Sequence, residues 1–127
     1  MKIVSLIAQY LLGVTFLFFG ANLFLNFLHA PMPTGTTGQF FGALFVSHFI
    51  YVIAFFQVAP ALLLLANRFV PLGLILLAPM IVGILFVHIL MEPSGLPIAI
   101  IVVVLWLLAA YPVRSAFAGL LQPRVQK

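Results

Sequence analysis

The sequence contains no cysteine and very few charged residues. Without cysteine, this chain cannot form a disulfide framework, a thiol redox pair or a thiolate metal site. Any redox role would therefore need a bound cofactor or a partner subunit. Only 5% of the 127 residues are charged, whereas an ordinary soluble domain has about a quarter. Aspartate is absent and Glu92 is the single acid, and neither a catalytic triad nor a glycine-rich phosphate loop is visible.

Apolar residues fill most of the chain instead, at 66% of the sequence. They form four long runs, which predict helices at about 3–28, 40–66, 71–91 and 96–114, followed by a basic tail at 118–127. Each run approaches or exceeds the ~20 residues that cross a bilayer, and none alternates like a barrel strand. The first run is longer than the ~7–15 apolar residues of a signal peptide, so we expect it to stay as a mature helix. The predicted fold is all-α: one four-transmembrane-helix bundle spanning residues 1–127.

The few charges predict the orientation of this bundle. Loops that carry Lys or Arg stay in the cytoplasm. No Lys or Arg occurs in the connections 29–39 and 92–95. All the cations lie in the segments expected on the other side of the membrane: Lys2, Arg68, Arg114, Arg124 and Lys127. Both termini are therefore expected in the cytoplasm, as four crossings require. The cations are scattered rather than gathered in a patch, which argues against nucleic-acid binding.

Polar side chains inside the apolar runs are the candidates for function, because they are costly in a bilayer. On the first helix, the 3.6-residue period places Asn22, Asn26 and His29 on one face and Gly13 and Gly20 on the opposite face. The outer half of the membrane is expected to hold this Asn face together with polar residues from the rest of the chain. These are Gln39 in the connection, His48 and Tyr51 in the second run, and His88 and Glu92 at the end of the third. The inner half has fewer such residues: Gln9, Tyr10 and Gln57.

The predicted binding site combines six of these outer residues: Asn22, Asn26, His48, Tyr51, His88 and Glu92. Groups of this kind can hydrogen-bond the carbonyls of a quinone while aromatic rings hold its ring. Glu92 follows His88 at i+4 and would orient it if the helix continues that far. The spacing contains no recognised metal motif, and haem is disfavoured because His48 and His88 differ by about 8 Å in depth at ~1.5 Å per residue. The alternative is that these residues only tie helices together.

The chain resembles the DoxX family of small four-helix membrane proteins over most of its length. The most specific stretches are Asn67-Arg68-Phe69-Val70-Pro71-Leu72-Gly73, Leu76-Leu77-Ala78-Pro79, Phe86-Val87-His88, Glu92-Pro93-Ser94-Gly95-Leu96-Pro97, Phe19-Gly20-Ala21-Asn22 and Pro31-Met32-Pro33. His88 matches the usual histidine of the family. Gln57 stands where many relatives have Glu, and Gly83 where many have Asn.

The resemblance implies a protein of the bacterial inner membrane with a redox association. Some relatives are subunits of a thiosulfate:quinone oxidoreductase, and others associate with redox-stress proteins. Three functions stay open at this point: a membrane protein with a quinone-like ligand, a scaffold or accessory subunit of a larger complex, and a small-solute transporter. A membrane or periplasmic redox partner and a homo-oligomer also stay open.

Overall fold

The computed structural model describes residues 2–29 and 31–124, which are almost entirely helical and contain no strand. The main helices are α1 (Lys2–Leu25), α2 (Gly35–Val46), α3 (Ile50–Ala66), α4 (Val70–Leu90), α5 (Leu96–Ala110) and α6 (Ser115–Ala118). Short 3-10 turns occupy Pro93–Gly95, Tyr111–Val113 and Gly119–Leu121. The all-α prediction is confirmed for this part of the chain.

Three helical stretches are long and apolar enough to cross a membrane: Lys2–Leu25, Val70–Leu90 and Pro93–Val113. The pair α2 and α3 adds a fourth stretch if it is counted as one span, but the two helices are bent by 87° at a short break. Length and composition are therefore compatible with a multi-pass membrane protein of three or four spans.

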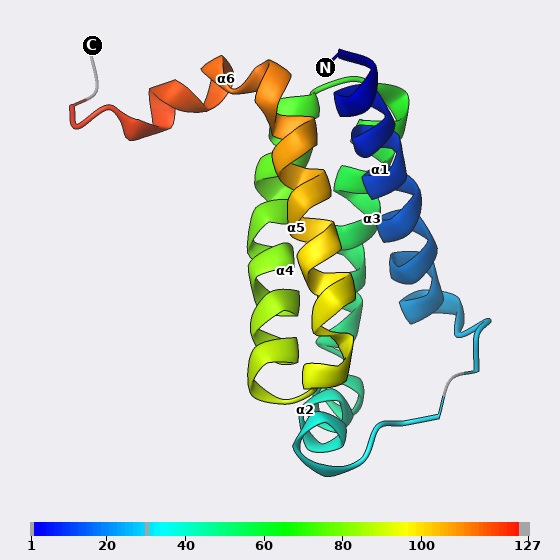
Figure 1. Cartoon of the computed structure of the whole chain (residues 1–127). Coiled ribbons are helices and arrows are strands. Elements are labelled where there is room, and N and C mark those ends of the chain that lie inside the picture. Colours follow the sequence, from blue (N-terminus) through cyan, green and yellow to red (C-terminus); the bar gives the residue numbers. More distant parts are fainter. Residues whose placement is uncertain (1, 30, 125–127) are drawn as a thin grey trace.

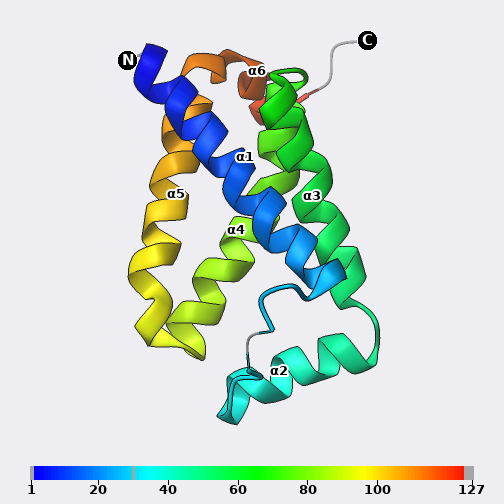
Figure 2. The same ribbon diagram turned by 90° about the vertical axis from the view of Figure 1, so that its right-hand side faces the viewer.

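The helices α1, α3, α4 and α5 run alongside one another (Figures 1 and 2), and α2 lies across one end. α1 packs against α3 and α5, and α4 packs against α3 and α5. Gly13 and Gly20 of α1 are buried, and a Cβ at Gly20 would lie 2.8 Å from Val58 Cγ2. The predicted small-residue face of the first helix is thus the face that packs on α3.

The single helix predicted for residues 40–66 is divided in the structure, which corrects that expectation. α2 ends at Val46, and the turn at 47–49 precedes α3. Ser47 Oγ accepts a hydrogen bond from Phe49 N at 3.2 Å and lies 3.2 Å from Leu44 O, while His48 takes a positive φ of 65°. The hydroxyl offers the backbone an alternative to the helix. The helix also begins earlier than predicted, so residues 35–39 are not part of the connecting loop.

The remaining helix ends differ by a few residues. The first predicted helix stops at Leu25 rather than 28, and the fourth stops at Ala110 rather than 114. The third, predicted at 71–91, is α4. In the predicted tail, Gly119–Leu121 form a 3-10 turn, and residues 125–127 lie outside the described residues.

The charges separate along the long axis of the molecule. The first turn of α1, the α3–α4 turn and α6 share one end, and the α4–α5 turn lies at the other (Figure 1). The first end carries the cations Lys2, Arg68 and Arg114, and the second carries Glu92. Lys127 lies outside the described residues.

Candidate functional site

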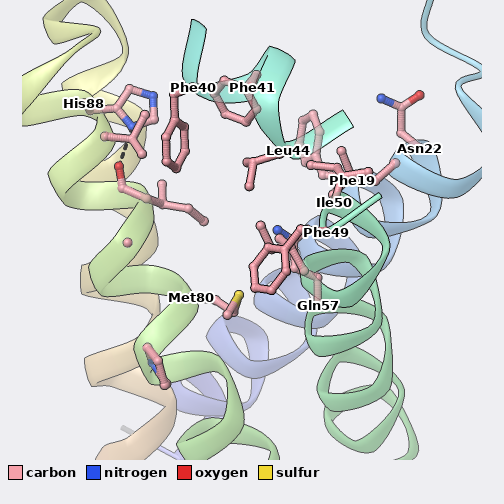
Figure 3. A pocket seen from close by; sticks show the side chains of 16 residues that line it. Phe19, Asn22, Phe40, Phe41, Leu44, Phe49, Ile50, Gln57, Met80 and His88 are labelled. Atoms are coloured by element: carbon pink, nitrogen blue, oxygen red, sulfur yellow. Dashed lines mark hydrogen bonds between the residues drawn. The ribbon is translucent and has the colours of Figure 1, made fainter. Parts of the chain in front are cut away.

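A cavity of about 480 Å³ lies between α1, α2, α3 and α4, at the end of the molecule that carries α2 (Figure 3). Its lining is mostly aliphatic and aromatic, and three residues supply polar side chains: Asn22, Gln57 and His88. The full lining is Phe19, Asn22, Leu23, Phe40, Phe41, Leu44, Phe49, Ile50, Ile53, Gln57, Pro79, Met80, Gly83, Ile84, Val87 and His88. A large, mostly apolar pocket with a few polar groups is the usual form of a small-molecule site.

The helix α2 covers one side of the cavity with Phe40, Phe41 and Leu44. One hydrogen bond holds it there: the Thr37 hydroxyl donates to Met91 O, at the end of α4, at 3.2 Å. Thr37 is only 4% exposed. The bend at 47–49 therefore has a consequence for the site, because it folds α2 over the space between α3 and α4.

His88 enters the cavity from α4 and is fixed by its own helix. Its Nδ1 lies 2.8 Å from the backbone oxygen of Ile84, one turn earlier (Figure 3). Its ring also packs against Gly95, where an added Cβ would overlap the imidazole. These two contacts determine how the ring is oriented.

Asn22 enters from α1, close to the end of that helix. Its Oδ1 accepts a hydrogen bond from Leu28 N at 2.9 Å, which closes the chain over the last turn of α1. The amide group of Asn22 keeps its N–H donors for another partner.

Gln57 lines the cavity although it is not among the six predicted site residues. The sequence predicts this residue in the inner half of the membrane, outside the predicted binding site. Its side chain was expected to point away from His48 and Tyr51, and it does: those two residues lie outside the cavity, so the cavity is on the other face of α3 from the predicted site. Gln57 lines the cavity together with Asn22 and His88. Its position as the one amide in an apolar helix was the available signal, since polar groups in such helices are functional candidates by default.

Four of the six predicted site residues do not line this cavity: Asn26, His48, Tyr51 and Glu92. Asn26 follows the end of α1 with a positive φ of 50°, so it no longer shares the helical face of Asn22. Tyr51 stacks between Phe24 and His48, with ring centroids 5.7 Å and 6.0 Å apart. These rings form an aromatic contact between α1 and the start of α3, outside the cavity.

Glu92 does not orient His88, which corrects the expected pairing. α4 ends at Leu90, and Glu92 has φ −139° and ψ 73°, outside the helical region. Pro93 follows it, and a residue before proline is disfavoured in the helical conformation. The carboxylate accepts from Ser94 Oγ at 3.1 Å instead. Backbone oxygen, rather than the one acid of the chain, is the partner of His88.

At the opposite end of the molecule, Gln9 is a structural residue. It is 7% exposed and donates from Nε2 to Leu64 O at 2.9 Å and to Asn67 Oδ1 at 3.0 Å. This joins α1 to the end of α3, where Asn67 takes a left-handed conformation. Tyr10, beside it, is exposed and does not line the cavity.

Two further features bear on what the site can hold. Within residues 2–29 and 31–124, no three His, Cys, Asp or Glu side chains gather closely enough to hold a metal ion. A second hollow of about 470 Å³ lies beside Trp106 and Phe117, and its lining is apolar apart from the indole. That indole is already used, since Trp106 Nε1 donates to Leu74 O at 2.8 Å. The cavity with Asn22, Gln57 and His88 is therefore the better candidate for specific binding.

Comparisons with protein-family models, with curated proteins and with solved structures give no match for this chain.

Proposed function

We propose that this protein is an integral membrane protein that binds a quinone-like amphiphile in the cavity between α1, α2, α3 and α4. The observation that carries the proposal is the lining of that cavity. Aromatic and aliphatic side chains surround three separated polar groups, which come from three helices: Asn22, Gln57 and His88. A volume of about 480 Å³ lies within the ~300–1,000 Å³ typical of small-molecule sites.

The chemistry of the lining suits a flat ring with oxygen substituents better than a charged solute. Residues with rings, including Phe19, Phe40, Phe41 and Phe49, offer flat apolar surface, and no charged residue among those that the structure describes lines the cavity. A bound ion would therefore be left without a compensating charge. An uncharged amphiphile dissolves in the bilayer and pairs its few oxygens with the amides and the imidazole.

The proposal includes the cellular setting. It is a redox-associated protein of the bacterial inner membrane, similar to the DoxX family, with four spans in which α2 and α3 count as one and with both termini in the cytoplasm. The support is the separation of Lys2, Arg68 and Arg114 from Glu92 along the helix axes. Because the chain lacks cysteine, single cysteines can report the orientation. A membrane-impermeant thiol reagent should label Ser94→Cys from outside intact cells, and Ser115→Cys only after the membrane is opened. The reverse pattern contradicts the orientation.

Binding can be tested with a matched pair of glycine variants. Gly83 lines the cavity, Gly42 does not, and a Cβ at either position meets nothing within 4 Å. Gly83→Leu should therefore fill the cavity, and Gly42→Leu should leave it open. In detergent, we expect the unmodified protein and Gly42→Leu to bind decylubiquinone, and Gly83→Leu to bind it at least about tenfold more weakly, a loss of roughly 1.4 kcal/mol.

Equal binding by the two variants would contradict the site. Absence of binding together with a stable membrane partner in native mass spectrometry would contradict the proposal and favour an accessory subunit or scaffold. Solute uptake into liposomes without quinone binding would favour a transporter.

A further inference from the structure

The hydrogen bond that His88 makes within α4 determines which kind of group its neutral ring offers to a ligand. Its Nδ1 lies 2.8 Å from Ile84 O, and a carbonyl oxygen can only accept, so Nδ1 carries the ring hydrogen. In a neutral imidazole the other nitrogen then has a lone pair and no hydrogen. That nitrogen, Nε2, belongs to a ring that lines the cavity and lies next to Gly95, and it makes no hydrogen bond to another of the described residues.

The other two polar groups of the cavity differ from His88 in this respect. Asn22 already uses Oδ1 to accept from Leu28 N, which leaves its N–H donors. Gln57 carries an amide, which can both donate and accept a hydrogen bond. The cavity therefore has an acceptor on α4, donors on α1, and an amide of both kinds on α3.

We propose that the cavity selects a ligand with a hydroxyl donor for His88 Nε2, and so prefers the reduced hydroquinone over the quinone of the same ring. This inference rests on the proposed function and specifies which form of the ligand the site takes. A hydroquinone hydroxyl donates to Nε2, and its other hydroxyl oxygen can accept from an amide of Asn22 or Gln57. A quinone has only acceptors, so its oxygen would face the lone pair of Nε2.

The preference has a predictable size. A quinone leaves Nε2 desolvated and without a hydrogen-bond partner. The binding free energy lost in this way is enough to weaken binding by about tenfold. Binding alone is proposed here, so no electron transfer is required of the chain. A tenfold preference for the reduced form would raise the midpoint potential of the bound two-electron couple by about 30 mV.

The test compares three ligands that share one ring and one tail: decylubiquinol, decylubiquinone and the dimethyl ether of decylubiquinol. The ether keeps the shape of the quinol but lacks both hydroxyl donors. Binding is measured in detergent under argon for the unmodified protein, His88→Phe and Gly42→Leu. We expect the quinol to bind about tenfold more tightly than the quinone and the ether. The preference should persist in Gly42→Leu and disappear in His88→Phe.

A second measurement does not depend on a variant that folds well. With ¹⁵N-labelled histidine, NMR should show His88 protonated at Nδ1 and free at Nε2, and addition of quinol should move the Nε2 signal far more than the ether does. Equal binding of all three ligands, or a preference that survives His88→Phe, overturns the inference and leaves the proposed function standing. Failure of every ligand to bind, in a protein whose circular dichroism shows intact helices, overturns the proposed function itself.

Discussion

The imidazole of His88 lies against Gly95, in space that any larger residue at position 95 would fill. A Cβ built on Gly95 would overlap Cδ2 and Nε2 of the ring. The backbone of Gly95 has φ −91°, which an L-residue can adopt, so the glycine is required here for space rather than for conformation. Gly95 lies in the turn between α4 and α5, and the turn therefore determines where the cavity histidine can sit.

Gly95→Ala should displace the His88 ring and weaken ligand binding without removing any polar group. We expect the affinity for decylubiquinol to fall about tenfold, as in His88→Phe. The double variant should be no weaker than His88→Phe alone, because both changes remove the same contact. A double-mutant cycle of binding affinities measures this. Gly119→Ala, where a Cβ meets nothing within 4 Å, serves as the control. Additive losses would show that Gly95 acts independently of His88.

Two glycines in long helices should respond to alanine with opposite signs. Gly83 of α4 has open space around its missing side chain, so Gly83→Ala should raise the free energy of unfolding by about 0.5–1 kcal/mol. At Gly20 of α1 the added methyl meets Val58 Cγ2 at 2.8 Å and Val58 N at 3.3 Å. Gly20→Ala should therefore lower that free energy by about 1–3 kcal/mol. Denaturant titration in detergent, followed by circular dichroism, compares the two; changes of the same sign would contradict the packing of α1 on α3.

The sequence could predict where the helices lie, because each apolar run is bounded by a charge or by Gly and Pro. It could not predict the break at 47–49. Ser47 and His48 interrupt a run whose neighbours are all apolar, and hydropathy averaged over a span does not register one hydroxyl hydrogen bond or one positive φ. The bend, and with it the placement of α2 over the cavity, depends on these local features.

Only part of the lining of the cavity could be predicted from the sequence. Asn22 and His88 lie within α1 and α4, which are unbroken, and both line the cavity. Gln57 was left out of the predicted site because the face of α3 that carries Tyr51 was chosen, whereas the cavity lies on the face that carries Gln57. Glu92 was paired with His88 by counting one turn past Leu90, where α4 ends. The following Pro93 was the signal that the helix would not continue.

Gln9 should contribute to stability, not to binding. In Gln9→Leu the Asn67 side-chain oxygen loses its donor, while Leu64 O keeps the bond from Asn67 N at 3.2 Å. The free energy of unfolding should therefore fall by about 1–2 kcal/mol. The neighbouring change Tyr10→Phe is the control: Tyr10 is exposed, and we expect an effect within about 0.5 kcal/mol. Ligand affinity should be the same in both variants. A loss of affinity in Gln9→Leu would show that the two ends of the molecule are coupled.

Thr37→Val should loosen α2 and leave the other helices unchanged. The substitution keeps the shape of the side chain but removes the hydroxyl that donates to Met91 O at 3.2 Å. Because a typical hydrogen bond contributes about 1 kcal/mol, α2 should open about fivefold more often. Hydrogen exchange of Gly35–Val46 should accelerate by that factor while exchange of Leu96–Ala110 does not change. The affinity for the amphiphile should fall by a similar factor, since Phe40, Phe41 and Leu44 of α2 line the cavity.

The matched control for α2 is Thr36→Val, one residue earlier. Thr36 is exposed, so its exchange and binding should equal those of the unmodified protein. A cysteine at Phe40 gives a second readout, since it would be the only thiol in the chain. In the Thr37→Val background it should react faster with a thiol reagent than in the Thr36→Val background. Equal labelling rates and equal exchange would mean that the Thr37–Met91 bond does not hold α2, and that other contacts of α2 hold it in place.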